Sequence, residues 1–292
     1  MNIGIIGAGK VGCALALGFY NNNINISGIY SRSNDSVLEL SRKLAKDFDN
    51  SLVDTVKKSD VVFLAVSDNG IRSVAEDIAS KVEKKSIENK VFFHLSGAMS
   101  SDELDVLKDL GGHSASLHPV QTFAGKAEGW KRLYNIYFGF EGCNISKEYA
   151  NTIVECFNGT MLCIKKEDKS LYHAAACIVS NYTVTLSYIA SEMLTGLGFE
   201  KEDCEKVFLP LIKNTVENLD RRGILNSITG PIERGDDKII AKHIDKIESE
   251  DKGLAKIYSM LGQKTLELVL KKERINEKEK VKMREVLSKE EK

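Results

Sequence analysis

Residues 3–12 read IGIIGAGKVG, an apolar run that leads into Gly7, Gly9 and Gly12. Glycines at this spacing, between a strand and a helix, are typical of a loop that binds the pyrophosphate of a dinucleotide. The first allows a tight turn, the second lets backbone approach a phosphate, and the third lets the helix pack on the strand. The helix would begin near Lys10 and direct free N–H groups at the phosphate. The stretch therefore predicts a dinucleotide site, with a structural turn as the alternative.

Strand and helix patterns alternate through the first half of the chain. Residues 24–31, INISGIYS, suit a second strand, and residues 60–66 suit a buried parallel strand followed by a helix from about Ile71. Later stretches carry helical spacing with no strand between them. We therefore expect an α/β fold, with a Rossmann doubly wound sheet over residues 1–166 and an all-α substrate and dimerisation domain over residues 167–292.

Composition excludes several classes of partner. The 292 residues carry 41 basic and 42 acidic side chains in mixed order, a formal net charge of −1, so neither nucleic acid nor a membrane is expected to bind. The six cysteines form no C-x-x-C pair, and no metal is expected. No apolar run reaches the roughly 18 residues that span a bilayer, and no signal segment precedes the first strand. We expect a cytoplasmic protein.

The end of the second strand indicates which cofactor binds. An acidic residue there would bind the ribose 2′-hydroxyl of NAD, whereas this chain has Ser31, Arg32 and Ser33. Two hydroxyls and a guanidinium can donate to the 2′-phosphate of NADP, so NADP is expected rather than NAD. The alternative is that Arg32 is only a surface residue.

Loops at the carboxyl ends of strands are expected to hold the rest of the site, because ligands of doubly wound sheets bind there. One such loop follows the buried strand at residues 60–66, and another contains Ser96. The expected cofactor contacts are Gly7, Gly9, Lys10, Val11, Gly12, Ser31, Arg32, Ser33, Val66, Ser67 and Asp68.

His118 is the candidate for the proton exchange that accompanies hydride transfer, because imidazole titrates near neutral pH. It is expected in a loop on the cofactor side, before Pro119 and close to the polar Gln121 and Thr122. The alternative is a histidine that only forms hydrogen bonds within a loop. His94 alternates inside a predicted strand and is expected to be structural.

A second group of candidates follows in the first long helix of the helical domain. Lys169, His173, Cys177 and Asn181 recur every four residues and so form a slowly drifting stripe. Asn181 could orient a substrate oxygen, and His173 is an alternative proton carrier. The stripe could equally be an interface in which each polar group has a partner.

Several segments together resemble a bacterial family of Rossmann-like oxidoreductases with a C-terminal helical domain of unknown function. That family is similar to pyrroline-5-carboxylate reductase, ketopantoate reductase, the β-hydroxyacid dehydrogenases and prephenate dehydrogenase. These enzymes join a Rossmann domain to a helical domain and often dimerise through it. The segments that carry the resemblance are GIIGAGKVG, FLAVSDNGI, HLSGAMSSDEL, SLHPVQTFAG, DKSLYHAAACIVSNY and TGPIERGD.

The resemblance also implies residue roles. His118 and Pro119 are similar to the His-Pro motif of prephenate dehydrogenases, whose histidine contacts the reacting substrate. Ser96 would lie near the nicotinamide, and Asn181 is similar to the helix asparagine of the hydroxyacid enzymes. Those enzymes place a lysine four residues before the asparagine, where this chain has Cys177. A general-acid lysine is therefore not implied at that position.

Together these features predict an NADP-dependent oxidoreductase that transfers a hydride between nicotinamide and a small polar substrate, a hydroxy or keto acid or an imine. His118 would exchange the proton, and Ser96 and Asn181 would orient the reacting group. A carboxylate substrate would need a basic residue, for which Arg234 and Lys169 are candidates. We expect a homodimer through the helical domain. The rival prediction is a regulatory or scaffold protein that binds NADP without turnover.

Overall fold

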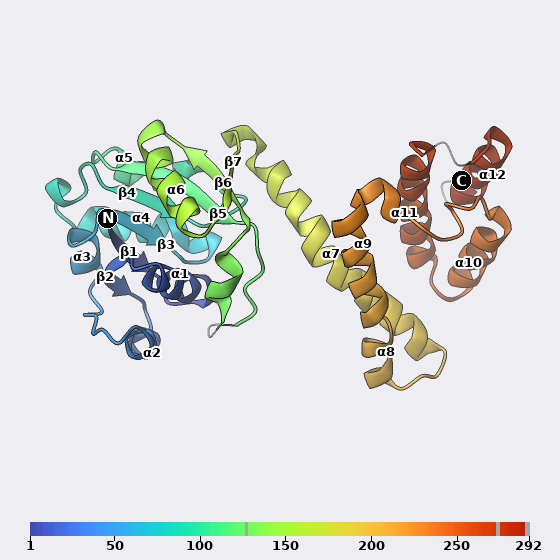
Figure 1. Cartoon of the computed structure of the whole chain (residues 1–292), viewed down its shortest axis with the longest axis horizontal. Coiled ribbons are helices and arrows are strands. Elements are labelled where there is room, and N and C mark those ends of the chain that lie inside the picture. The colour runs from blue at the N-terminus through green and yellow to red at the C-terminus, as the bar shows by residue number, and fades with distance from the viewer. Residues whose placement is uncertain (126–127, 273–274, 290–292) are drawn as a thin grey trace. The chain divides into compact units, whose positions relative to one another are not determined.

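The computed structural model describes residues 1–125, 128–272 and 275–289 (Figure 1). The chain divides into two compact units, Met1–Thr185 and Leu186–Lys292. The division falls inside the long helix α7 (Lys169–Gly196). The sequence predicts the boundary between the two domains at residues 166 and 167, from the change from strands to helices. In the structure this change occurs where α7 begins.

The first unit is built on one seven-stranded sheet with the order β2-β1-β3-β4-β5-β6-β7 (Figure 1). Strands β1 to β5 are parallel, β6 runs antiparallel to β5, and β7 is parallel to β6. The order reverses between β1 and β3, which lie side by side. The strands are β1 (Asn2–Ile6), β2 (Asn25–Tyr30), β3 (Val61–Leu64), β4 (Val91–His94), β5 (His113–Pro119), β6 (Tyr137–Gly142) and β7 (Thr160–Cys163).

Both faces of the sheet are covered, and the alternation of side chains along the strands shows how. Val61 and Phe63 of β3 join a core with α1 and α6, whereas Val62 and Leu64 join a second core with α3 and α4. The predicted doubly wound α/β fold is thereby confirmed. The helices of this unit before α7 are α1 (Lys10–Asn21), α2 (Asn34–Leu44), α3 (Leu52–Lys57), α4 (Asp68–Lys81), α5 (Asp105–Lys108) and α6 (Asn144–Cys156), with 3-10 turns η1 (Lys84–Ser86), η2 (Ser101–Leu104), η3 (Gly129–Leu133) and η4 (Lys166–Asp168).

The second unit is helical, as the sequence predicts. Helices α10 to α12 enclose a small core that includes Ile240, Leu266 and Met283. Gly223 has φ +72° and interrupts helix α9. Across the described ranges we find no helix that combines the length and the apolar character needed to cross a membrane. After α7, the helices are α8 (Lys201–Val207), α9 (Leu209–Ser227), α10 (Asp237–Glu250), α11 (Lys252–Leu270) and α12 (Glu277–Leu287).

Candidate active site

The glycine loop between β1 and α1 has the geometry that its spacing predicts. Gly7 has φ +106°, and a Cβ on it would overlap the carbonyl oxygen of Ala65. A Cβ on Gly12 would overlap the carbonyl oxygen of Gly7, so helix and loop approach closely only because neither residue has a side chain. Gly9 differs, because a Cβ there would meet no atom within 4 Å. Its backbone faces open space, where a phosphate could approach.

The N-terminus of α1 is suited to an anion. Gly9 is its N-cap and supplies no side-chain hydrogen bond, and the first turn contains no acidic residue. The exposed Lys10 and the half-buried Val11 begin the helix. The first N–H groups and the positive end of the helix dipole therefore remain for a phosphate, so these residues fit the pyrophosphate of a dinucleotide.

The three residues after β2 take up distinct positions. The half-buried Ser31 donates its N–H to Oδ1 of Asn50 at 2.9 Å. Ser33 is the N-cap of α2, and its hydroxyl accepts from the N–H of Ser36 at 3.3 Å. Arg32 lies between them and is exposed. A guanidinium beside a helix N-terminus fits a 2′-phosphate, although the Ser33 oxygen already serves as the cap.

The loop after β3 is shorter than expected. Helix α4 begins at Asp68, with Ser67 as its N-cap, and not near Ile71 as the sequence indicated. The residues SDNG look like a turn, but they form the N-cap and first turn of the helix. Val66 is half-buried and Ser67 and Asp68 are exposed at the carboxyl edge of the sheet, one strand from the glycine loop.

The loop after β4 is organised by His94. This ring is fully buried; Nδ1 accepts the N–H of Ser96 at 3.2 Å, and Nε2 lies 3.0 Å from the carbonyl oxygen of Ser100, to which it donates. Burial and, secondly, the charge of Lys169 lower the pKa of His94 to about 4. His94 is neutral and structural, as expected, and it fixes the path of residues 96–100.

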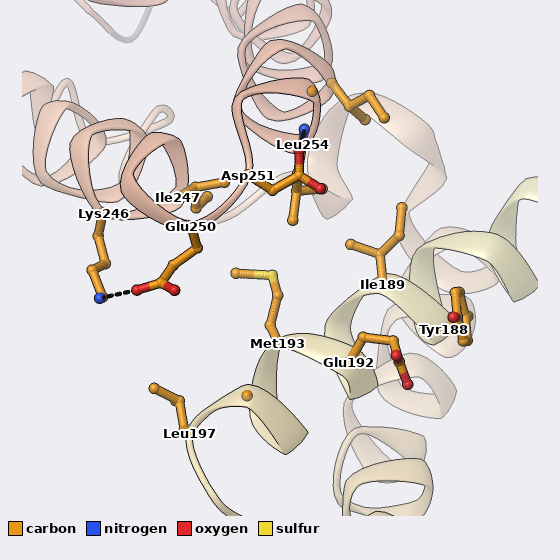
Figure 2. A pocket seen from close by; sticks show the side chains of 13 residues that line it. Tyr188, Ile189, Glu192, Met193, Leu197, Lys246, Ile247, Glu250, Asp251 and Leu254 are labelled. Atoms are coloured by element: carbon orange, nitrogen blue, oxygen red, sulfur yellow. Dashed lines mark hydrogen bonds and ion pairs between the residues drawn. The ribbon is translucent and has the colours of Figure 1, made fainter.

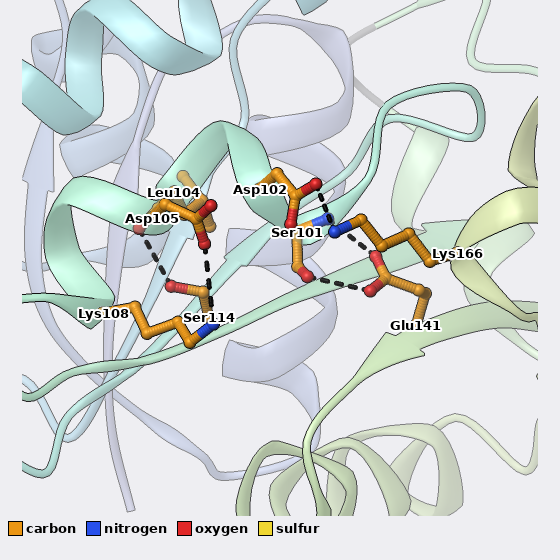
Figure 3. A network of polar contacts seen from close by, with 8 residues as sticks. All are labelled: Ser101, Asp102, Leu104, Asp105, Lys108, Ser114, Glu141 and Lys166. Atoms are coloured by element: carbon orange, nitrogen blue, oxygen red, sulfur yellow. Dashed lines mark hydrogen bonds and ion pairs between the residues drawn. The ribbon is translucent and has the colours of Figure 1, made fainter.

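The segment after this loop is tied to β6 (Figure 3). Glu141 of β6 accepts two hydrogen bonds from Ser101, from the N–H at 2.7 Å and from the hydroxyl at 2.8 Å. Lys166 forms an ion pair with Asp102. Ser114 of β5 donates to the carbonyl oxygen of Leu104 at 3.0 Å. These contacts hold the segment that follows the loop, residues 101–104, beside β5 and β6.

His118 lies within β5 and not in a loop, and Pro119 is the last residue of that strand. Its Nδ1 is 2.9 Å from the hydroxyl of Tyr172 on α7, and its ring centroid is 6.1 Å from that of His173. Burial, then the charges of Lys169 and His173, lower the pKa of His118 to about 4. The structure therefore joins both histidine candidates in one cluster at the carboxyl edge of the sheet.

Lys169 is buried next to this cluster. It is 2% exposed, and its Nζ donates to the carbonyl oxygen of Ser96 at 2.9 Å and to the hydroxyl of Ser116. Burial lowers the pKa of Lys169 to about 8. The sequence offered Lys169 as a residue that lines a pocket, but its ammonium group is engaged in the interior. Ser96 is also buried, and its Oγ accepts from the N–H groups of Ala98 and Met99 at 3.2 and 3.0 Å.

In the part of the chain that the structure describes, two candidates, Asn181 and Arg234, form no hydrogen bond with the cluster. Asn181 is exposed, and its position eight residues beyond His173 places it roughly 12 Å further along α7. Arg234 belongs to the second unit, where it pairs with Asp236 at 3.0 Å. No group of three or more His, Cys, Asp or Glu side chains that could hold a metal ion occurs in the described ranges.

Sequence reasoning missed Tyr172, Ser116 and Gly139. Tyr172 lies three residues after Lys169 and therefore on the same face of the helix. A stripe defined by four-residue spacing does not include it. Ser116 and Gly139 belong to neighbouring strands, and their closeness to α7 depends on long-range pairing.

A cavity of about 740 Å³ lies in the second unit (Figure 2). The end of α7 contributes Ile189, Met193 and Leu197, and α10 and α11 contribute Ile247 and Leu254. Met193 points from α7 toward the other helices (Figure 2). Because its lining is mainly apolar and holds no histidine, we do not assign the chemistry to this cavity.

Two domain families match the chain. Residues 2–87 match the family described as NADP oxidoreductase coenzyme F420-dependent. Residues 136–265 match a domain of unknown function, DUF2520. Among curated proteins, pyrroline-5-carboxylate reductase 2 of Rattus norvegicus is 35% identical over 91 residues, which are 30% of this chain and 28% of that protein. The chain therefore aligns with less than a third of this relative.

Solved structures share the fold over a much longer stretch. Protein TM1727 from Thermotoga maritima is 28% identical, with a TM-score of 0.74 over 94% of this chain and 100% of that chain. An imine reductase from Myxococcus stipitatus in complex with NADP+ is 15% identical, with a TM-score of 0.60 over 93% of each chain. The latter likeness concerns the fold alone. The chain carries a domain of the NADP oxidoreductase family followed by a DUF2520 domain, which confirms the predicted family of Rossmann-like oxidoreductases.

Proposed function

We propose that this protein uses NADP to transfer a hydride between the nicotinamide and a small polar substrate, a hydroxy or keto acid or an imine. The observation that carries the proposal is that the glycine loop and the His118 cluster lie at the carboxyl ends of parallel strands of one sheet. Doubly wound sheets bind ligands at this edge, where the strand order reverses. The reversal here lies between β1 and β3.

The cofactor is assigned to residues that surround this reversal. Gly7 and Gly12 allow the close turn between strand and helix, Gly9 leaves room for the pyrophosphate, and Arg32 would pair with the 2′-phosphate. Lys10, Val11, Ser31, Ser33, Val66, Ser67 and Asp68 complete the proposed site. When bound, the cofactor supplies the hydride at C4 of its nicotinamide.

The substrate is assigned to the His118 cluster. Because the pKa of His118 is about 4, the ring is neutral at pH 7 and can either accept a proton or donate a hydrogen bond. His173 is the second proton carrier, since its ring lies against that of His118. The hydroxyl of Ser96 accepts two backbone N–H groups and keeps its own proton to donate to the reacting group. Asn181, roughly 12 Å beyond His173 on α7, is too far to orient a small substrate at His118 and has no role in this proposal.

Calorimetric titration with NADPH and NADH tests the cofactor assignment. Removal of a charge-assisted contact in Arg32→Ala should weaken NADPH binding by roughly 10- to 100-fold and leave NADH binding nearly unchanged. Arg42→Ala is the matched control, because Arg42 is an exposed arginine further along α2. Absence of binding of either nucleotide would overturn the oxidoreductase proposal. Tight binding without turnover on keto acids or cyclic imines would support the rival regulatory role.

The helical region is the proposed homodimer surface. Large apolar side chains on α7 and α9 are exposed, among them Val179 at 75% and Leu211 at 62%. Monomeric proteins rarely leave such side chains in contiguous patches, because covering them is favourable. A second copy of the chain presents the same apolar helices, so it can cover these side chains with its own.

A further inference from the structure

The contact between Tyr172 and His118 leaves one ring nitrogen for a substrate. The Tyr172 hydroxyl lies 2.9 Å from Nδ1 of His118, and the two rings meet edge to face at 88°. Throughout residues 1–125, 128–272 and 275–289, we find no hydrogen-bond partner for Nε2 of this ring. Nε2 is therefore the atom through which His118 can meet a substrate.

Two glycines make this contact possible. Gly139 of β6 lies opposite His118 in the antiparallel pair, and a Cβ on it would overlap the Tyr172 hydroxyl. Gly97 lies against the other side of the cluster, where a Cβ would come within 2.6 Å of Cδ2 of His173 and 3.0 Å of Cε1 of His118. The phenol and both imidazoles are thus held in a slot that larger residues at positions 97 and 139 would close.

The protonation states of the pair allow the phenol to donate to the ring. Burial raises the pKa of Tyr172 to about 12, so its hydroxyl keeps its proton at neutral pH. The imidazole of His118 is neutral at the same pH, so only one of its nitrogens carries a proton. If the phenol donates to Nδ1, the imidazole proton must be on Nε2.

We infer that Tyr172 is a positioning residue that holds His118 in the tautomer with its proton on Nε2, so that His118 meets the substrate as a hydrogen-bond donor. This inference rests on the proposed function. The substrate atom opposite Nε2 is then an acceptor, such as the carbonyl oxygen of a keto acid or the nitrogen of an imine. During reduction, the Nε2–H bond breaks as the new bond to the substrate atom forms. The Tyr172 O–H bond breaks as its proton moves to Nδ1, which keeps the ring neutral, and the phenolate then takes a proton from a solvent water molecule, which leaves as hydroxide.

Nitrogen NMR of the unliganded full-length protein, labelled with ¹⁵N-histidine, tests the tautomer directly at pH 7.5. The signals of His118 are identified by their absence from His118→Ala. We expect a protonated Nε2 and an unprotonated Nδ1. A protonated Nδ1 would mean that the imidazole donates to the phenol, and this outcome would overturn the inference.

Titration of the same signals in variants tests the role of Tyr172. A hydroxyl that donates to the neutral ring lowers its pKa, so Tyr172→Phe should raise the pKa of His118 by roughly 0.5 to 1. Gly139→Ala, which retains the phenol but displaces it, should give the same direction of change. Tyr182→Phe, an exposed tyrosine on the same helix, should give none. A fall or no change in Tyr172→Phe would overturn the assignment.

These readings need neither cofactor nor substrate. A protein with the expected tautomer that fails to bind NADPH would overturn the proposed function and leave the assigned hydrogen bond intact. A protein that binds NADPH but has the other tautomer would overturn only the role of Tyr172. In an active protein, Tyr172→Phe should lower kcat more than it raises KM, because the positioned proton matters mainly in the transition state.

Discussion

Burial and the neighbouring ammonium group of Lys169 together hold the pKa of His118 at about 4. Lys169 reaches this position from the first turn of α7 and donates to the carbonyl oxygen of Ser96 at 2.9 Å. The lysine therefore has two effects on the candidate site: it fixes the loop that carries Gly97, and it disfavours a second positive charge on the imidazole.

The stability of the protein should rise between about pH 8 and pH 10.5 because of Lys169. Its pKa is lowered to about 8 by burial, against an ordinary value of 10.5 in the unfolded chain. Between these values the unfolded chain binds the extra proton, so a rise in pH favours the folded state by about 3 kcal/mol at most. Urea unfolding at pH 7.5 and 9.5 measures the difference.

Lys169→Met should remove this part of the pH dependence. It should also raise the pKa of His118, because the charge that lowers it is gone. Lys147→Met, at an exposed position on α6, is the control and should preserve the rise. An undiminished rise in Lys169→Met would show that the lysine is not the group responsible.

Acid should destabilise the protein between about pH 6.5 and pH 4 through His94. Its pKa of about 4 in the folded protein lies below the ordinary 6.5, so the unfolded chain binds the proton first as pH falls. Between pH 7 and pH 5, protonation of His94 should lower the free energy of unfolding by about 2 kcal/mol, and protonation of His118 should lower it by a similar amount. Urea unfolding of wild type and His94→Gln measures it, with His113→Gln at the start of β5 as the control. An equally steep loss in His94→Gln would contradict the assignment.

Alanine substitutions at Gly9 and Gly12 should have different effects on cofactor binding and on folding stability. At Gly9 a Cβ meets no atom within 4 Å, so Gly9→Ala should change unfolding stability by less than about 0.5 kcal/mol. It should nevertheless weaken NADPH binding, because the methyl group occupies the space proposed for the pyrophosphate.

At Gly12 a Cβ would overlap the carbonyl oxygen of Gly7, so Gly12→Ala should lower stability by roughly 1–3 kcal/mol. Calorimetry and urea unfolding on both variants measure the two effects. Unchanged NADPH affinity in Gly9→Ala would argue against a pyrophosphate at this loop.

Local pattern is sufficient to predict most of the sheet. The run Val61–Leu64 is apolar on both faces, as a strand covered on both sides requires, and the glycine spacing fixes the loop after β1. The residues ASLHPV (115–120) also suit a strand, which β5 confirms, but the expectation that His118 lies in the loop after this strand is wrong. Pro119 suggests a loop, yet it pairs with Phe138 of β6, because position 119 is the end of the strand and the missing N–H is tolerated there.

The sequence indicated two histidines of the candidate site but not the contacts that they form. His118 and His173 follow from residue chemistry and position in the chain. The hydrogen bond between Tyr172 and His118 joins residues 54 positions apart, and the ammonium group of buried Lys169 depends on the Ser96 carbonyl and the Ser116 hydroxyl, which are contributed by distant segments. A single sequence records no such distances. It therefore could not distinguish a lysine that lines a pocket from one that fixes a loop.

Substitution of an exposed apolar residue of α7 by aspartate should disrupt the proposed dimer. We expect the wild type to scatter light with about twice the mass of the 32.4 kDa chain. Val179→Asp would bury an unpaired carboxylate in the interface, which should weaken association by at least roughly 30-fold, or about 2 kcal/mol. Because Val179 is 75% exposed within one chain, its replacement should leave the melting temperature of the monomer nearly unchanged.

Leu38→Asp provides the matched control, since Leu38 is also an exposed aliphatic residue, at 45%, but lies on α2 and not on α7. It should remain dimeric at protein concentrations where Val179→Asp is monomeric. Light scattering across a dilution series measures both variants. A monomeric wild type, or equal association of the two variants, would show that the apolar face of α7 is not covered by a second copy.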